Sequence, residues 1–345
     1  MSWVSPLAIV VAPWKSQPAP EGARTPAPTH PVRDYAGDLL AVIYICAISL
    51  IASLTGAFYV LFPELGALSW DVMRRPRGRW GAAPGLLAIT PAITGALGTA
   101  ATRNLPYGFA SVVIVVCGSV VILRLMRSPI APAISAGLLP LTLGVKSWWY
   151  PPGVLLGSIL LAGLLLGWRN FVPPTAAAPA DAHPSAAPSQ PHRDPLIDLN
   201  WFAPLLIFVL VAVAMVQLTG LRFILFPPLV VILYEMFHAP QRCPWAPHLG
   251  RLPVVCFAAA LGGFLLHREI HSAPVAAALS MAWGVAILRL FRANVPPALA
   301  VALLPMVIAR PTMLYPVSVG IGIGVGTLWF AVVQRFQARR DNNYA

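Results

Sequence analysis

Two six-residue stretches each place a pair of arginines at the end of an apolar run. ILRLMR occupies residues 122–127 and ILRLFR occupies residues 287–292. A spacing of three puts Arg124 with Arg127, and Arg289 with Arg292, on one face of a helix. The guanidinium group presents a planar fork of N–H donors that suits carboxylate, nitrite or phosphate oxygens. The two pairs are therefore candidate anion-binding groups.

The residues after each pair predict the start of a further helix. Serine and asparagine are favourable N-cap residues, and proline fits a first helical turn because no N–H is needed there. The free N–H groups and the positive dipole end of such a helix start would add to an anion site. We therefore predict a substrate site over the helix starts at 129–133 and 295–298. Its residues are Arg124, Arg127, Ser128, Pro132, Arg289, Arg292, Asn294, Pro296 and Pro297.

The arginine pairs also admit a simpler interpretation. Arginines at the ends of apolar helices extend to lipid headgroups and hold the helix at the membrane interface. If the two stretches are copies of one ancestor, duplication would preserve an anchor as faithfully as a binding site. The sequence leaves both interpretations open.

Carboxylates within the apolar segments are candidates for proton transfer. Glu64, in LFPEL, lies deeper than the other acids, and an intramembrane acid is a functional candidate because its burial is costly. Its counterpart in the second half is Pro228, so one half alone would carry a coupling proton. Asp71 and Glu235 occupy equivalent positions near basic loops, and we expect interfacial ion pairs there.

Signals for metal, cofactor or enzyme chemistry are weak. His267, Glu269 and His271 lie together in LLHREIHS, but two histidines four residues apart need further ligands to hold a metal. We predict a solvated loop there and no metal. The sequence has no phosphate-binding loop, dinucleotide fingerprint or familiar hydrolase motif. We therefore expect no cofactor, and we do not expect an enzyme.

The composition predicts a polytopic membrane protein of the all-α class. Of the 345 residues, 58% are hydrophobic and 10% are charged, against about 25% charged in a soluble domain. The net charge is +12, but the arginines lie in short loops between apolar runs, which is typical of membrane topology. We therefore expect the lipid bilayer and a small anion as partners and no nucleic acid. The oligomeric state is left open.

The two halves of the sequence resemble each other, which indicates a tandem duplication. LTGAFYVLFPEL at 54–65 matches LTGLRFILFPPL at 218–229, and APAISAGLLP at 131–140 matches PPALAVALLP at 296–305. WYPPGVLLG at 149–157 matches LYPVSVGIG at 314–322 in the same order. These matches have offsets of 164 and 165 residues and keep proline and glycine in register, which chance similarity of apolar sequence would not do.

Each half divides into six apolar segments. Because six is even, the two halves would enter the membrane in the same direction, as parallel repeats. Several segments have only about 16 residues, or about 24 Å of helix, so the expected number of transmembrane helices is eight to twelve. The predicted organisation is a disordered Pro/Ala-rich segment 1–37, a first membrane repeat 38–170, a linker 171–199, a second repeat 200–336 and a cytoplasmic tail 337–345.

The basic residues predict the orientation. If every segment crosses, one side receives fourteen arginines and the other receives five basic residues. This imbalance predicts a multi-pass protein of the cell inner membrane with both termini in the cytoplasm. The larger group is Arg74, Arg75, Arg77, Arg79, Arg124, Arg127, Arg169, Arg242, Arg251, Arg289, Arg292, Arg335, Arg339 and Arg340; the smaller is Arg103, Lys146, Arg222, Arg268 and Arg310.

Each half is similar to the HPP family of integral membrane proteins. The similarity lies in the order of LFPPL, a basic APQR segment, a PPA-type turn before a small-residue helix, and WYPP. The resemblance covers about 260 residues in two copies and implies four spans per unit and an association with nitrite transport. The histidine of the family's His-Pro-Pro motif is absent from both halves, which have Val295-Pro296-Pro297 and Ile130-Ala131-Pro132.

Together these patterns favour a secondary transporter or facilitator of a small anion, with nitrite implied by the resemblance. In this hypothesis Arg127 and Arg292 act with the two helix starts at the interface of the halves. The main alternative is a non-transporting membrane scaffold or accessory subunit. An enzyme acting on lipid or isoprenoid would need paired intramembrane acids or histidines, and the sequence offers few.

Overall fold

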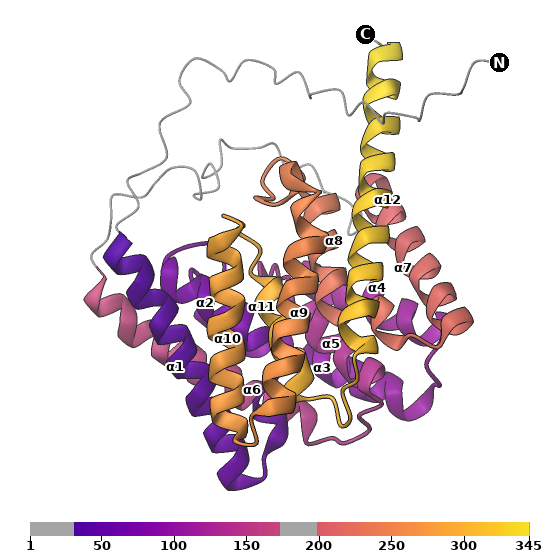
Figure 1. Cartoon of the computed structure of the whole chain (residues 1–345). Coiled ribbons are helices and arrows are strands. Elements are labelled where there is room, and N and C mark those ends of the chain that lie inside the picture. The colour runs from indigo at the N-terminus through magenta and orange to yellow at the C-terminus, as the bar shows by residue number, and fades with distance from the viewer. Residues whose placement is uncertain (1–30, 173–198, 345) are drawn as a thin grey trace, which may run out of the picture.

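The computed structural model describes residues 31–172 and 199–344, and these fold into one bundle of α-helices (Figure 1). No strand occurs among the described residues, so the predicted all-α class is confirmed. The first half contains α1 (Pro31–Thr55), a 3-10 turn η1 (Phe58–Val60), α2 (Glu64–Arg74), α3 (Pro84–Asn104), α4 (Phe109–Leu125), α5 (Pro132–Leu143) and α6 (Tyr150–Phe171).

The second half has its elements in a similar order. It contains α7 (Leu199–Thr219), η2 (Arg222–Leu225), α8 (Pro227–His238), η3 (Ala246–His248), α9 (Arg251–Glu269), α10 (Ala273–Leu290), α11 (Pro297–Leu303), η4 (Leu304–Met306) and α12 (Leu314–Tyr344).

Some predicted boundaries differ from the structure. Helix α1 begins at Pro31 rather than near residue 38, because proline suits a first turn and Asp34 complements the helix dipole there. Helix α12 continues to Tyr344, through most of the predicted tail 337–345. The rest of the predicted disordered segment, 1–30, and most of the predicted linker, 173–198, lie outside the described residues.

Seven helices in the described part of the chain are long and apolar enough to cross a membrane. They are α1, α3, α6, α7, α9, α10 and α12. Their outer faces expose large apolar side chains such as Ile43, Ile159 and Val211, as expected for surfaces in contact with lipid. The helix lengths and these surfaces are those of a polytopic membrane protein.

The five shorter helices explain why seven is below the predicted eight to twelve. Helix α2 has only 11 residues. Together with η1 and the extended residues that precede α2, however, it brings the chain from the end of α1 back to the level of the start of α1. There Arg74, at the end of α2, pairs with Asp34 of α1 at 3.2 Å. Irregular backbone therefore completes a passage that the sequence pattern assigned to a single apolar segment.

Four of the short helices form the centre of the bundle. Nearly every residue of α2, α5, α8 and α11 is buried. Helix α2 packs against α5 and α11, and α8 likewise packs against both. On the outside α1 of the first half contacts α10 of the second, and α7 of the second contacts α4 of the first. The two halves are therefore interlocked rather than placed side by side.

Matching contacts occur 165 residues apart. The Tyr150 hydroxyl donates to the carbonyl of Ala136 at 2.8 Å, and the Tyr315 hydroxyl donates to the carbonyl of Val301 at 2.6 Å. Glycine allows a close helix approach at Gly98 of α3 and Gly263 of α9, since a Cβ there would collide with the backbone of α5 or α11. Such pairs are what two copies of one helical unit would produce, and the tandem duplication stays a prediction.

The two charge groups of the sequence lie at opposite ends of the bundle. At one end, here called the arginine-rich end, α1 and α7 begin and α4 and α10 finish (top in Figure 1). At the other end Arg103 donates to the carbonyl of Lys146 at 2.8 Å, and Arg222 stacks over Tyr107.

The glycine contacts predict a position-specific loss of stability. Replacing Gly98 or Gly263 with alanine should lower the free energy of unfolding by about 1–3 kcal/mol, because the methyl group would collide with a backbone carbonyl. Gly163→Ala is the control, since its position has open space and alanine favours a helix. Thermal unfolding in detergent measures the effect; equal stability of all three variants would contradict the packing described.

Candidate functional site

The outer arginine of each pair, Arg127 or Arg292, ends its helix in a left-handed conformation. Their φ angles are 50° and 47°, and among the described residues no other residue except glycine has positive φ. The next amide bonds back into the helix, from Ser128 to the Leu123 carbonyl and from Ala293 to the Leu288 carbonyl, both at 2.8 Å. This is a Schellman-type C-cap, a position that glycine normally fills.

The inner arginines, Arg124 and Arg289, bind to the first helix of the opposite half. Arg289 donates from Nε to Oδ2 of Asp38 at 2.7 Å and lies 3.8 Å above the ring of Tyr35, both in α1. Arg124 lies 5.4 Å above the ring of Trp201 in α7. Both inner arginines therefore hold the halves together, and the Asp38 carboxylate already occupies one of them.

The predicted helix starts differ from the structure. Ser128 and Asn294 are not the N-caps, because α5 starts at Pro132 after Ala131 and α11 starts at Pro297 after Pro296. The side chain of Ser128 instead lies 2.9 Å from Thr90 Oγ1 and accepts the Ile130 amide at 3.3 Å.

Amides at both helix starts already have partners. Ala133 donates to the Ile130 carbonyl at 3.1 Å, and Ala298 donates to the Val295 carbonyl at 3.0 Å. The next amides, of Ile134 and Leu299, are bonded in the same way. An anion at either helix start would therefore depend on the arginine side chains rather than on free backbone donors.

Glu64 is a buried carboxylate in the interior of the bundle. It is 1% exposed, begins α2, and accepts a hydrogen bond at Oε1 from the Ser135 hydroxyl of α5. Its other oxygen, Oε2, is buried without a partner in the part of the chain described. The carboxylate lies within electrostatic range of the phenols of Tyr150 and Tyr315, which occupy equivalent places in the two halves.

The position of Ser135 places Glu64 near mid-depth. Helix α5 runs beside α3, and the hydroxyl of Thr94, halfway along α3, donates to the Ala133 carbonyl of α5 at 2.6 Å. Ser135 lies two residues further along α5, so its partner Glu64 is far from both ends of the 21-residue α3.

Asp71 and Glu235 form the ion pairs expected at the basic end. Asp71 pairs with Arg75 in the next turn, and both Glu235 oxygens accept from Arg79 Nη1 at 2.8 and 3.1 Å. Burial acts to lower the pKa of Arg79, but the Glu235 carboxylate outweighs it and the pKa is raised. Arg79 therefore stays charged and joins the α2–α3 loop of the first half to α8 of the second.

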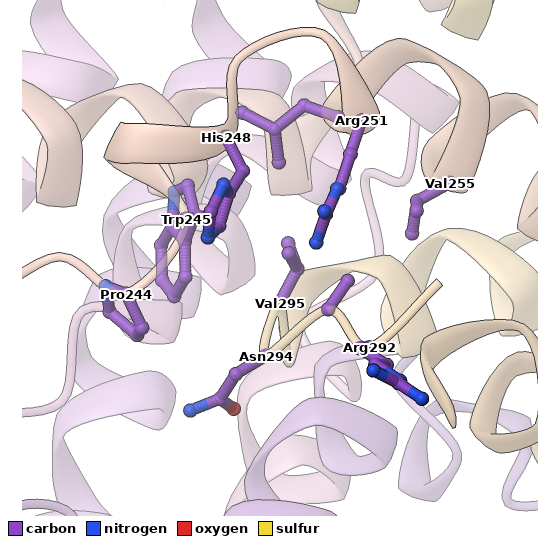
Figure 2. Close-up of a pocket in the computed structure, with 10 residues that line it drawn as sticks. Pro244, Trp245, His248, Arg251, Val255, Arg292, Asn294 and Val295 are labelled. Atoms are coloured by element: carbon purple, nitrogen blue, oxygen red, sulfur yellow. The ribbon is translucent and has the colours of Figure 1, made fainter. Parts of the chain in front are cut away.

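A pocket of about 100 Å³ lies at the arginine-rich end of the second half (Figure 2). It opens between the segment 244–252 and the turn 292–295 that follows α10. Figure 2 shows His248 and Arg251 extending toward that turn, whereas the Arg292 guanidinium points away from them. Of the predicted residues, Arg292 and Asn294 line this pocket, while Arg124, Arg127 and Arg289 do not.

The structure thus divides the predicted site among several places. Glu64 lies in the interior, Arg124 and Arg289 join the halves, and the exposed Arg127 ends α4 apart from the pocket. Sequence reasoning missed His248, Arg251, Trp245 and Asp38. One signal could have pointed to Arg251. It places a charge at the start of an apolar run, whereas the first half has the apolar Leu86 at the matching position.

No group of three or more His, Cys, Asp or Glu residues gathers in a metal-binding arrangement within 31–172 and 199–344. Arg268 and Glu269, in the segment with two histidines, form an exposed pair at 3.5 Å. Comparison with family models, curated proteins and solved structures found no match, so the resemblance to the HPP family stays a prediction.

The left-handed arginines predict an unusual response to glycine. Arg127→Gly and Arg292→Gly should each raise the free energy of unfolding by about 1 kcal/mol relative to glutamine at the same position, since glycine adopts positive φ without steric cost. Unfolding in detergent at matched lipid content measures the difference. If the glutamine variants are the more stable, side-chain contacts rather than the cap dominate these positions.

Proposed function

We propose that the chain is a secondary transporter or facilitator of a small anion in the cell inner membrane, and that Glu64 carries a coupling proton. Nitrite is the first anion to test, because the resemblance to the HPP family implies it. The observation that carries the proposal is the Glu64 carboxylate, which is enclosed at mid-depth with one hydrogen bond and one unpartnered oxygen.

The surroundings of Glu64 suit proton movement. No ion pair of the described residues involves Glu64, so a proton is the charge that would balance it. A carboxylate buried without compensation is costly and marks ion or proton pathways in membrane proteins. Co-transport of a proton with an anion would move no net charge through this apolar centre.

The outer arginines are the proposed points of anion entry. Arg127 and Arg292 are exposed at the arginine-rich end, where α5 and α11 lead from that end into the bundle. A guanidinium there would attract and bind an oxyanion through paired N–H donors. The arginine-rich end would face the cytoplasm, together with both termini, by the positive-inside rule.

The proposed architecture is two parallel copies of one helical unit. The equivalent tyrosine contacts, the two left-handed arginines and the crossed pairs α1–α10 and α7–α4 support it. A two-fold axis along the membrane normal would relate such copies. Glu64 would then lie close to this axis, since its carboxylate is within electrostatic range of Tyr150 of one copy and Tyr315 of the other.

A non-transporting scaffold or accessory subunit is the second candidate. The close packing of α2, α5, α8 and α11, with almost all their side chains buried, favours it. So does the pairing of Arg289 with Asp38, which gives one of the predicted site arginines a structural partner. Transport measurements separate the two functions, because a scaffold predicts no flux.

The role of Glu64 predicts loss of coupled transport in Glu64→Gln. Proteoliposomes that contain a pH-sensitive dye should acidify when nitrite is added outside, faster than empty liposomes do. Glu64→Gln removes the titratable group and should abolish the protein-dependent acidification. Glu269 is an exposed acid at the end of the bundle opposite the arginine-rich end, and Glu269→Gln should behave as wild type. Wild-type rates in Glu64→Gln would refute the proton role.

The outer arginines predict a separate loss of anion entry. The double variant Arg127→Gln, Arg292→Gln should reduce nitrite flux at least tenfold, because both guanidiniums at the entry are removed. Size-exclusion chromatography checks that the protein remains folded. The matched control is Arg103→Gln with Arg310→Gln at the other end of the bundle. Unchanged flux in the first variant would exclude the arginine site.

A further inference from the structure

Apolar and polar side chains share the lining of the pocket in Figure 2. Its polar lining is His248, Arg251, Arg292 and Asn294, and no acidic residue is part of it. Among the described residues no ion pair involves Arg251 or Arg292. The net character of this wall is positive, so its complement is an anion.

Trp245 closes one wall of the pocket with its ring. The residue is 5% exposed and lines the pocket. Its indole N–H is buried beneath that surface, so the donors that a ligand can reach on this side are those of His248 and Arg251.

The start of α9 adds to the same charge. Helix α9 has 19 residues, begins at Arg251 beside the pocket, and follows Gly250, which provides no side-chain cap. The dipole of a helix this long favours an anion at its start, although the Leu252 amide already donates to the Leu249 carbonyl at 3.3 Å and Pro253 has no N–H. Within the described part of the chain the Arg251 side chain makes one hydrogen bond, a long one of 3.5 Å from Nη1 to the Phe291 carbonyl, so its other donors remain for a ligand.

The first half lacks this set of residues. At an offset of 165 the tryptophan is repeated as Trp80, but Ala83 takes the place of His248 and Leu86 takes that of Arg251. Anchors copied by duplication would occur in both halves. Arg292 has a counterpart in Arg127, but Arg251 and His248 have none, so these two donors are specific to the second half.

We propose that this pocket binds a phosphate-type oxyanion, with Arg251 and His248 as its donors. The phosphate belongs either to a free ion or to the headgroup of a phospholipid. The pocket lies at the end of apolar helices, where headgroups reside, and its volume of about 100 Å³ suits one tetrahedral oxyanion rather than a larger molecule. The proposal does not rest on the transport function, because Glu64 and nitrite have no part in it.

Thermal unfolding of the full chain in an uncharged detergent tests the proposal. Inorganic phosphate, phosphatidylglycerol and phosphate-free diacylglycerol are added separately. A ligand near a hundredfold above its Kd should raise the unfolding midpoint by about 5 °C or more. A rise with both phosphate compounds identifies a free-oxyanion site, and a rise with phosphatidylglycerol alone identifies a headgroup site. No rise with either, or an equal rise with diacylglycerol, overturns the proposal.

Variants tie the shift to the pocket. Arg251→Gln with His248→Gln should abolish the rise, while Arg268→Gln, at the far end of α9, should keep it in full. Arg251→Lys keeps the charge and removes the forked guanidinium donors, and should weaken binding about tenfold. It serves as the deciding variant if the double variant fails to fold. A wild-type shift in Arg251→Lys, or in a folded double variant, would overturn the assignment to this pocket.

Discussion

Backbone hydrogen bonding in an apolar surrounding is the constraint on which this structure depends. Within lipid each unbonded N–H or C=O group costs several kcal/mol, so irregular backbone is tolerated where protein encloses it. The short helices α2, α5, α8 and α11 have such irregular flanks, and they occupy the centre, surrounded by the long helices. The arrangement places chain breaks, and with them polar groups such as Glu64, in the interior.

Interlocking of the halves follows from this arrangement. The helices of one half do not fully enclose the short central helices of that half. Helices α1 and α7 complete the enclosure, because they pack against α10 and α4 of the other half. The arginines act at these junctions. Arg289 reaches Asp38, Arg124 reaches Trp201, and Arg79 reaches Glu235, so charge and ring contacts fasten the ends of helices whose sides are apolar.

Much of the fold could be predicted from the sequence, because apolar runs and proline positions report helices directly. The all-α class and the apolar segments before and after Arg127 and Arg292 followed from composition and periodicity. The left-handed conformation of those arginines could not be predicted, since glycine is the usual residue there. The partners of Arg289 and Arg79 lie 251 and 156 residues away, and no local pattern reveals such pairs.

The central claim is that a proton and a small anion move together. Transport of the anion under an imposed proton gradient tests this claim most directly. Proteoliposomes are given equal nitrite on both sides and a proton gradient, and nitrite inside is followed over time against empty liposomes. Coupled transport predicts protein-dependent accumulation of nitrite on the alkaline side against its concentration gradient. If nitrite stays at equal concentration, or changes no faster than in empty liposomes, the protein does not couple the two and the claim is wrong.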